Sequence, residues 1–564
     1  MFVVEGGNAT FTMSKTCIYY LHPLLAGKID MWGGQFDRIA AMGFDTVGIA
    51  PPFLSGASGD LFRIGDHERL DPRLGAGDAG LALARLAEEA GSRRLGLTLD
   101  VVVDQVAAEA LLHGGLSAWY GIDTDDEPPD PRQPPRQPGV ANLCVGAELS
   151  GLAASWARRL SEWASAGVGG FRCIRPHRPP ATWWREVISA VRERHPDVLF
   201  MAWTPDLEAT EARALGASGF DRVACCSGAW DYRTGGFAET VDCLAQIAPL
   251  ITMPEAPFDR RLCRAFSDSS RARKAAGRAL AFTAAYGAGW LMPMGFEFGA
   301  TRHMDPARDR PEDFAHLVAE ARFDLTAEIA AANARCASSL EAKSTGSVRA
   351  LSPPDAPAAA LLVADRSDAA PGARPRVILV NASLDDPVRV PVAPLLTTSG
   401  LNGVVLGDDA GEPVASDGAI MIGPGGVRIL RAIATAPIGR PTLDVIEAAA
   451  APRIAIEAVS PSVDEGRFPA KRLVGDIVEV SADLIADGHD RLAAALLWRA
   501  EDEPDWREAP MTPFDNDRWI GRFPLTRIGR YLFTVLAWKD RFGNFADELE
   551  RKHAAGVPTG LELE

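Results

Sequence analysis

The stretch SEWASAGVGGFRCIRPHRPPATWWREVISAVRERHPDVLFMAWTP, residues 161–205, contains two short apolar segments on either side of a helical pattern. Residues 169–174 (GGFRCI) and 198–203 (VLFMAW) have the length and composition of buried strands. The apolar residues between them recur at the spacing of one helix face: Trp184, Val187, Ile188 and Val191. The stretch therefore predicts a strand–helix–strand unit of a parallel sheet.

The same pattern repeats from residue 15 to residue 338. The apolar, strand-like runs in this region are TCIYYL, TVGIAP, LGLTLDVVV, GGFRCI, VLFMAW, RVACC, LITM and GWLMPMG. About eight strand–helix repeats are typical of a closed (β/α)8 TIM barrel. An open doubly wound sheet is the alternative, but no glycine-rich phosphate fingerprint follows the first strand.

Two insertions interrupt this repeat. Residues 51–75 form a Gly- and Asp-rich segment after the second predicted strand, and we expect a loop there. Residues 114–145 follow the third strand and include DTDDEPPDPRQPPRQPG. The prolines of this segment exclude a helix or a central strand, so we expect a surface excursion.

The remaining chain is predicted to be all-β. Residues 339–436 contain short β-runs separated by Asp, Gly and Pro turns, which predicts a β-sandwich. Residues 437–452 have the composition of a linker. Residues 453–555 contain about seven short strands, a number typical of an immunoglobulin-like sandwich. The predicted fold class is thus multidomain, α/β plus all-β.

Composition and charge limit the possible functions. The 564-residue chain is 47% hydrophobic and 24% charged, which is typical of soluble globular proteins. A net charge of −17 argues against binding to nucleic acid or to an anionic membrane. We find neither a signal peptide nor an apolar run of membrane-spanning length. The eight cysteines lack a metal-ligand spacing. We therefore expect a cytoplasmic protein without metal or cofactor.

Two segments of the C-terminal region resemble a known family. RIAIEAVSPSVDEGRFPAKRLVGDIVEVSADLIADGHDRLAAALLWR and NDRWIGRFPLTRIGRYLFTVLAWKDRFGNF are similar to the N-terminal domain of bacterial α-1,4-glucan:maltose-1-phosphate maltosyltransferases. In the barrel, TVGIAPPF, HERLDPRLG, LTLDVVVDQ and GFRCIRPHRPPATWW resemble the catalytic domain of the same enzymes, within the α-amylase superfamily (glycoside hydrolase family 13). The family places this sandwich before its active barrel, whereas here it follows a barrel. The layout resembles the front part of a longer two-barrel protein.

The resemblance implies a pair of catalytic carboxyl groups that this chain lacks. Retaining chemistry at an anomeric carbon needs a nucleophile and a general acid/base about 5 Å apart. The family nucleophile is an Asp two residues after a strand Arg, and here Arg172 is followed two residues later by Ile174. The general acid, a Glu at the end of the next strand, corresponds to Trp203. Neither side chain can perform these steps.

The resemblance places further polar residues near the same strand ends. Asp259 in MPEAPFDRR would be the family's third carboxylate, or else a surface residue paired with Arg260 or Arg261. Asp100 matches the third-strand aspartate and is expected to be a hydrogen-bond acceptor near the pocket. Because a buried Arg172 without its aspartate needs another acceptor, we expect Asp100 or Asp259 to serve.

Several residues are candidates for sugar contacts. His177 matches a family histidine and would contact a sugar hydroxyl, or else cap the helix that begins at residue 181. Trp203 and Trp230 offer aromatic faces, with Asp231 beside the latter in GAWDYR, although core filling is the alternative role for such tryptophans. The pair at residues 183–184 is expected to be exposed and to offer the same kind of face.

The resemblance implies a function in α-glucan metabolism involving glycogen or maltose 1-phosphate. The degenerate barrel would bind α-glucan or malto-oligosaccharide, or act in assembly. The partner would then be a second copy or an active maltosyltransferase. The alternative is an active glycosyltransferase or glycosidase that transfers maltosyl units with displaced carboxylates, for which Asp60, Asp66 and Asp231 are candidates. On the residues alone, whether the protein is an enzyme stays open.

Overall fold

The chain forms two compact units, Met1–Pro437 and Ile438–Glu564, which are described separately. The fold is given by a computed structural model. The residues that it describes are 16–112, 116–122, 139–144, 149–205, 207–233, 235–338, 347–354, 356–364, 375–401, 404–408, 411–415, 418–435, 449, 453–464, 466–558 and 560. Within these residues, no helix is long and apolar enough to cross a bilayer.

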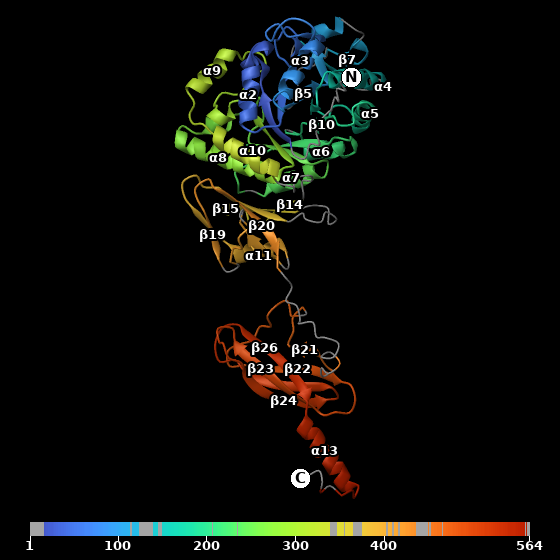
Figure 1. The fold of residues 1–564 in the computed structure, drawn as a ribbon, viewed down its shortest axis with the longest axis vertical. Coiled ribbons are helices and arrows are strands. Elements are labelled where there is room, and N and C mark those ends of the chain that lie inside the picture. Colours follow the sequence, from blue (N-terminus) through green and yellow to red (C-terminus); the bar gives the residue numbers. More distant parts are fainter. Residues whose placement is uncertain are drawn as a thin grey trace, which may run out of the picture. The chain divides into compact units, whose positions relative to one another are not determined.

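The first unit contains a closed parallel barrel, in the order β1-β13-β12-β11-β10-β9-β5-β2 (Figure 1). This confirms the predicted (β/α)8 barrel and excludes the open sheet. Its strands coincide with the eight apolar runs: β1 (Thr16–Leu21), β2 (Thr46–Ile49), β5 (Gly96–Val102), β9 (Gly170–Ile174), β10 (Leu199–Ala202), β11 (Arg222–Cys226), β12 (Leu250–Met253) and β13 (Gly289–Pro293).

Helices surround the barrel (Figure 1). They are α1 (Pro23–Ala26), α2 (Gly33–Ala41), α3 (Ala79–Gly91), α4 (Ser150–Ser165), α5 (Ala181–Arg192), α6 (Ala209–Ala214), α7 (Gly236–Ala245), α8 (Ser269–Tyr286), α9 (Pro311–Ala319) and α10 (Thr326–Ser338). Local sequence sets their ends: the Asp78 carboxylate, for example, accepts the backbone N–H of Leu81 and caps α3. The longer helices turn an apolar stripe inward, as the sequence pattern predicted.

The expectation that Trp183 and Trp184 are exposed is wrong. Both lie on the buried face of α5, at 4% and 0% exposure. Their indole N–H groups donate to the backbone carbonyls of Leu149 and Pro176. Two adjacent helical residues lie about 100° apart, so a wide inward face buries both.

The barrel closes where β1 pairs with β13. Gly289 stands opposite Thr16 at this seam, and a Cβ atom at Gly289 would lie 2.3 Å from the Thr16 carbonyl oxygen. Glycine is therefore required there by close backbone approach.

The first insertion is more ordered than expected. Residues 51–75 contain an antiparallel hairpin of β3 (Phe53–Ser55) and β4 (Ile64–Leu70) in place of a loop, and Phe53 is fully buried. The second insertion contributes β6 (Gln105–Ala107), β7 (Tyr120–Gly121) and β8 (Val140–Leu143) as a small sheet. Its proline-rich part, residues 123–138, lies outside the described residues.

The region after the barrel contains two small sheets. The strands of the larger sheet are β14 (Ser347–Ala350), β15 (Ala358–Ala364), β16 (Arg376–Asn381), β20 (Val427–Ala434) and β18 (Val404–Gly407), and those of the smaller are β17 (Val388–Pro391) and β19 (Ala419–Ile422). A helix, α11 (Val392–Ser399), adds to the all-β structure that the sequence predicted. Arg278 of α8 donates to the carbonyls of Asn381 and Ala382, which ties this region to the barrel.

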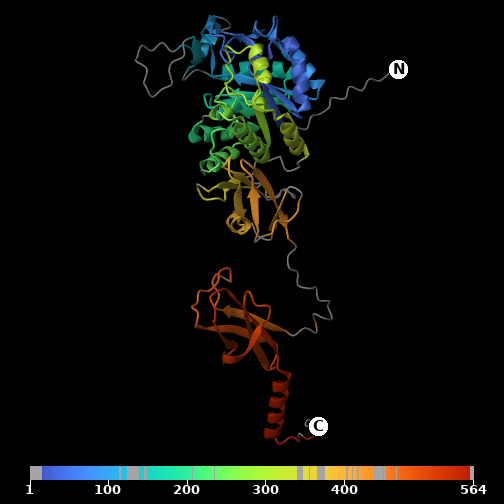
Figure 2. The same cartoon turned by 90° about the vertical axis from the view of Figure 1, so that its left-hand side faces the viewer.

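The second unit is a β-sheet structure followed by one helix. Its strands are β21 (Ile454–Ser460), β22 (Ile477–Ala486), β23 (Leu492–Ala500), β24 (Arg507–Asp515), β25 (Arg518–Pro524) and β26 (Tyr531–Lys539), in the order β21-β22-β25-β24-β23-β26. Val480, Ala482 and Leu496 are at the centre of its core, at 0% exposure. Helix α13 (Arg541–Ala554) projects from this sheet, and none of its residues is buried (Figure 2). The predicted linker, residues 437–452, lies outside the described residues except at position 449.

Asp45, directly before β2, is expected to make the free energy of unfolding depend on pH. Its carboxylate accepts the backbone N–H of Cys17 at 3.0 Å and the Thr46 hydroxyl at 2.7 Å. Burial raises the pKa of Asp45 to about 6, above its unfolded value near 4. The folded state therefore favours the protonated acid. The resulting stabilisation is fully present below about pH 4 and is lost as pH rises through about 6.

The measurement compares the wild type with Asp45→Asn by urea unfolding between about pH 4 and 7. As pH falls across this window, the free energy of unfolding of the wild type should rise by about 3 kcal/mol relative to that of the variant. Asp30→Asn, at an exposed position, is the control and should show no such change. Parallel stability curves for wild type and Asp45→Asn would contradict the assignment.

Candidate functional site

Arg172, Asp100 and Tyr20 form a buried cluster inside the barrel. Asp100 of β5 and Arg172 of β9 are direct partners in the strand register. The Asp100 carboxylate accepts Arg172 Nε at 2.6 Å and Nη2 at 2.5 Å, and also the Tyr20 hydroxyl at 2.6 Å. Asp100 is therefore the acceptor that Arg172 was expected to need.

Burial and pairing act in opposite directions on this cluster: burial raises the pKa of Asp100, although Arg172 and the Tyr20 hydrogen bond oppose the shift. Arg172 and Asp100 are 3% and 2% exposed. Burial opposes the Arg172 cation, but the Asp100 carboxylate outweighs it and raises the pKa of Arg172. Burial, together with the Asp100 charge, raises the pKa of Tyr20 well above its usual value. Tyr20 therefore donates to the carboxylate and stays neutral.

Trp203 covers the same guanidinium. The Arg172 carbon Cζ lies 4.3 Å from the centre of the Trp203 ring and 4.3 Å from that of Tyr20, so the cation is held between two aromatic rings. Such cation–π contacts are strongest when the groups are withdrawn from water. Trp203 itself is half-buried.

The two positions that should carry the catalytic carboxyls hold no acid. Ile174 is the last residue of β9 and Trp203 is the first residue after β10. In the register, β9 and β10 are neighbours, which is where the family comparison places nucleophile and acid. A hydrocarbon and an indole replace the two ionisable groups.

Two carboxylates that follow barrel strands, those of Asp104 and Glu255, are each ion-paired with an arginine. Asp104, after β5, is ion-paired with Arg175 at 3.1 Å. Burial raises the pKa of Asp104, although Arg175 opposes the shift. Glu255, after β12, is ion-paired with Arg261 at 2.5 Å and accepts the backbone N–H of Leu262. These pairs provide charge balance for a buried site.

The structure places Asp259 in an exposed position. Its carboxylate accepts the backbone N–H of Arg260 at 2.6 Å. The residue before it, Phe258, has φ 67, in the left-handed region that bulky side chains seldom adopt. The Phe258 ring packs edge-on against the Tyr20, His22 and Phe62 rings, at centroid distances of 5.0–5.8 Å. Phe258 thus joins the aromatic groups around the Arg172 cluster.

His177 lies in the loop between β9 and α5. Its Nε2 atom is 3.9 Å from the Glu211 carboxylate. Burial lowers the pKa of His177, so the ring is neutral at neutral pH. The alternative role as a helix cap is wrong, because the N-cap of α5 is Pro180, without a side-chain cap.

Trp230 belongs to a second aromatic group, and Asp231 follows it in the chain. The Trp230 ring stacks on Phe237 at 4.6 Å and packs against Tyr232 and Phe282. Asp231 is exposed and accepts the backbone N–H of Arg233. Of the other displaced candidates, Asp60 pairs with Arg63 and Asp66 accepts the backbone N–H of Glu68. Each therefore has a local structural role.

Three buried polar atoms near the ends of β5 and β9 have neither a hydrogen-bond partner nor an ion pair within the described residues. They are Asp104 Oδ1, Arg172 Nη1 and His177 Nδ1. Buried polar atoms are normally paired with protein, water or ligand. Sequence reasoning did not find Asp104 and Arg175 as a pair, nor Tyr20. Together these groups can donate hydrogen bonds to hydroxyls and accept hydrogen bonds from them. Among the described residues, no group of His, Cys, Asp and Glu could hold a metal.

Comparison with solved structures defines the class of the barrel. An α-amylase from Geobacillus thermoleovorans, solved with acarbose, aligns over 75% of this chain and 99% of its own, with a TM-score of 0.58 and 15% identity. A maltogenic α-amylase from Thermotoga neapolitana gives a TM-score of 0.55 at 16% identity, with the same coverage. The first unit therefore has an α-amylase-like fold.

Sequence comparison identifies the particular family that the chain resembles. Residues 452–564 match the family described as "Alpha-1,4-glucan:maltose-1-phosphate maltosyltransferase, domain N/S". A maltosyltransferase of this name from Burkholderia pseudomallei is 35% identical over 570 residues, covering 97% of this chain and 50% of the relative. The Myxococcus xanthus enzyme is 47% identical over 112 residues, which are 19% of this chain and 17% of that enzyme. The predicted resemblance is confirmed, and the chain spans about half the length of its Burkholderia relative.

Proposed function

We propose that this protein acts in α-glucan metabolism and that its barrel binds an α-glucan or malto-oligosaccharide without cleaving it. The observation that carries the proposal is the replacement of both catalytic carboxyls, by Ile174 and Trp203, at adjacent strand ends of an α-amylase-like barrel. The barrel scaffold is retained, while its defining acid pair is absent at these positions.

The surrounding carboxylates support the loss of catalysis. Asp100 holds Arg172, Asp104 holds Arg175, and Glu255 holds Arg261. A nucleophile and a general acid have to reach the same glycosidic bond from positions about 5 Å apart. Arg172 and Arg261 are buried, so withdrawing their carboxylates would leave an uncompensated charge, which is strongly unfavourable, whereas Arg175 is partly exposed.

The unpaired polar atoms support binding. Sugar hydroxyls both donate and accept, which fits the mixture of Asp104 Oδ1, Arg172 Nη1 and His177 Nδ1. The half-buried Trp203 offers an aromatic surface beside them. Structural neighbours of the fold bind such ligands: AmyP was solved with maltose, at a TM-score of 0.51.

The second unit supports a role in assembly, with a second copy or an active maltosyltransferase as partner. Its surface holds many exposed large apolar side chains, which are typical of interaction surfaces. On α13, Phe542 and Phe545 are 80% and 42% exposed and lie on one side of the helix at i, i+3 spacing. A second copy of α13 would cover this apolar side. We also place the protein in the cytoplasm, where its eight free cysteines stay reduced.

Incubation with maltose 1-phosphate and glycogen tests the absence of catalysis. Phosphate release is expected to equal the buffer blank, because no carboxyl pair is available at the two strand ends. Release above the blank would instead support the alternative of an active transferase with displaced carboxylates.

Calorimetric titration with a malto-oligosaccharide tests binding. His177→Ala is expected to weaken affinity by about tenfold, the effect of one lost hydrogen bond with its desolvated partner. Asp197→Ala, at an exposed turn before β10 and thus at the opposite end of the barrel, is the matched control and should leave affinity unchanged. Failure of the wild type to bind millimolar oligosaccharide would end the glucan-binding role.

A further inference from the structure

The first unit has a cavity of about 700 Å³ that three segments of the barrel enclose. One segment follows β1, one belongs to the insertion after β2, and one follows β13, and these three strands are neighbours in the barrel. The cavity therefore lies at the end of the barrel where its strands end, which is the end where TIM barrels bind their ligands. We call it the β13 cavity. Its charged lining residues are Lys28, Arg73, Arg308, Asp309, Arg310 and Glu312.

Contacts within the chain hold the walls of the β13 cavity together. Arg73 Nη1 donates to the Ala307 carbonyl at 2.8 Å, which joins the segment after β2 to the segment after β13. The charge of Arg73 is balanced by Asp71 at 2.8 Å. Gly27 has φ 79, and a Cβ atom there would lie 2.9 Å from the Pro311 side chain, so the segment after β1 packs directly against the start of α9. A cavity whose walls are already fixed loses little conformational entropy when a ligand binds.

Three cations of the lining have no carboxylate partner within the described part of the chain. They are Lys28, Arg308 and Arg310, and all three are exposed. Like charges that line one cavity repel each other, and an anion placed between them removes that repulsion. The lining therefore favours an anionic ligand.

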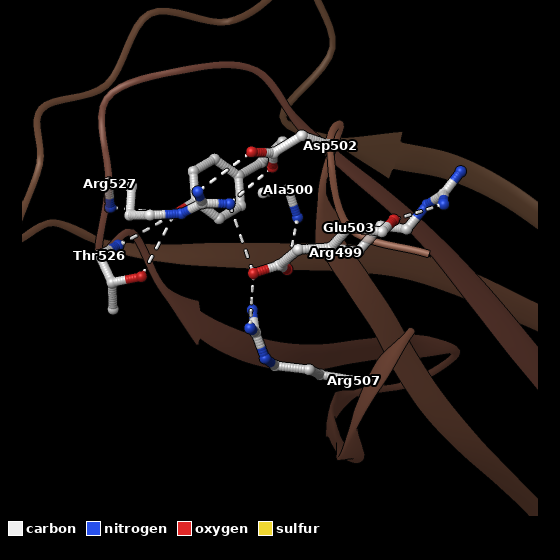
Figure 3. Close-up of polar contacts among 8 residues, drawn as sticks. Arg499, Ala500, Asp502, Glu503, Arg507, Thr526 and Arg527 are labelled. Carbon is white, nitrogen blue, oxygen red and sulfur yellow. Dashed lines mark hydrogen bonds and ion pairs between the residues drawn. The ribbon is translucent and has the colours of Figure 1, made fainter. Parts of the chain in front are cut away.

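Arginines on other turns of the molecule are paired. Figure 3 shows such turns in the second unit, where Arg527 contacts the Asp502 carboxylate at 2.6 and 3.1 Å and Arg507 contacts Glu503 at 2.8 Å. Cations that are paired in this way have little charge left for a ligand. The unpaired cations thus distinguish the β13 cavity from the arginine-rich turns of Figure 3.

The carboxylates around the β13 cavity have other partners, with one exception. Asp309 is 5% exposed and pairs with Arg302 at 2.8 Å. Asp313 pairs with Arg302 at 3.2 Å, and Asp305 accepts two backbone N–H groups of its own loop. Glu312 is exposed and has no ion pair with a described residue, so it opposes an anion. Within the lining, three unpaired cations stand against this one unpaired acid.

The start of α9 adds positive potential to the same cavity. This helix of nine residues lies between the eighth barrel strand, β13, and the last barrel helix, α10. The N-terminus of a helix carries a partial positive charge that favours anions. TIM barrels frequently bind phosphate with the loops after strands seven and eight and the N-terminus of a short extra helix. The loop after β13 and the first turn of α9 occupy that place here.

We propose that the β13 cavity binds a phosphate group, either on a sugar phosphate or as the free ion. A phosphate offers a charge of about −2 and several acceptor oxygens, which match the unpaired cations and the helix start. The volume of about 700 Å³ is in the range of small-molecule sites and leaves room for a sugar attached to the phosphate. The lining shares no residue with the Arg172 cluster, so the inference goes beyond the glucan-binding role and does not depend on it.

Calorimetric titration of the full chain with inorganic phosphate tests the proposal. The wild type is expected to bind with a Kd of about 1 mM or tighter at about 50 mM NaCl. Raising NaCl to about 500 mM should weaken binding, because the charges are screened. A second titration uses maltose 1-phosphate in saturating maltose, which occupies the proposed glucan site. Tighter binding of the ester than of the free ion assigns the cavity to a sugar phosphate, and equal binding assigns it to the ion itself.

Two variants change the lining in opposite directions. Arg308→Gln/Arg310→Gln is expected to raise the Kd for phosphate by about tenfold or more, because it removes two of the three unpaired cations. Glu312→Gln is expected to lower the Kd by about two- to threefold, because it removes the unpaired acid. A gain in affinity cannot come from a variant that fails to fold.

Arg194→Gln is the matched control. Arg194 is exposed and has no carboxylate partner among the described residues, but it lies in the turn before β10, at the opposite end of the barrel. Its substitution should change the Kd for phosphate by less than about twofold. Malto-oligosaccharide affinity, measured on the same variants, should stay unchanged. Loss of glucan binding in the wild type with retained phosphate binding would sink the glucan role and leave this inference standing.

Two results would overturn the inference. One is a wild-type titration without binding heat up to about 10 mM phosphate. The other is a Kd that stays within about twofold of the wild type in both Arg308→Gln/Arg310→Gln and Glu312→Gln, because the anion would then bind outside the β13 cavity.

Discussion

Replacing Asp100 with alanine is expected to lower the free energy of unfolding of the first unit by about 3–5 kcal/mol. The substitution leaves the Arg172 cation buried at 3% exposure without its bidentate acceptor. It also removes the acceptor of the Tyr20 hydroxyl. The aromatic rings of Tyr20 and Trp203 still cover the guanidinium, but they cannot replace a carboxylate charge.

Urea unfolding followed by tryptophan fluorescence measures this loss. Asp259→Ala, at the exposed position, is the control and should change stability by less than about 0.5 kcal/mol. The double variant Asp100→Ala/Arg172→Met should recover much of the loss, because it removes the uncompensated charge together with its partner. Equal stability of Asp100→Ala and wild type would show that Arg172 has another acceptor.

Acidification is expected to destabilise the first unit through His22. This residue follows β1 at 0% exposure, and its Nε2 atom lies 3.1 Å from the Asp305 carbonyl oxygen. Burial lowers the pKa of His22 to about 3, against about 6.5 in the unfolded chain. A lowered folded pKa gives stability that is present above about pH 6.5 and is lost as pH falls toward about 3. At about pH 4.5 the free energy of unfolding is lower than at neutral pH by about 3 kcal/mol through His22.

The variant His22→Gln retains a group that can donate to Asp305 and removes the titration. The comparison is best made in an Asp45→Asn background, because Asp45 contributes with the opposite sign between about pH 4 and 6. Asp309, which lies 3.5 Å from His22 Nε2, also faces this ring and is retained in both proteins. Between about pH 7 and 4.5, the protein that keeps His22 should lose stability relative to the His22→Gln variant. Parallel curves would contradict a neutral buried histidine.

The barrel was predictable from sequence because its strands carry a local signal. Every strand from Thr16–Leu21 to Gly289–Pro293 is a short apolar run, and burial on both faces removes any need for alternation. The short helix Val392–Ser399 was missed, since its Thr and Ser residues also suit strands and turns. Trp183 and Trp184 were misjudged because their burial depends on packing between helices.

The candidate site was predictable only in part. Ile174, Trp203 and Arg172 follow from positions along the chain, through the family pattern, which left Asp100 and Asp259 as the two possible acceptors for Arg172. Tyr20 belongs to the site because β1 lies near β5 in the closed barrel, and no local signal marks it. For Asp259 the sequence left two roles open, the family's third carboxylate or a surface residue, and the structure places it in an exposed position.

The seam at Gly289 has a consequence for synthesis. β1 cannot complete its pairing until the segment containing Gly289 has left the ribosome. At about 5–20 residues per second, this delay is roughly 15 to 55 s. During that time one edge of the wholly buried first strand is unpaired and can join the wrong chain. Slower translation is therefore expected to lengthen the time for which this strand edge is exposed.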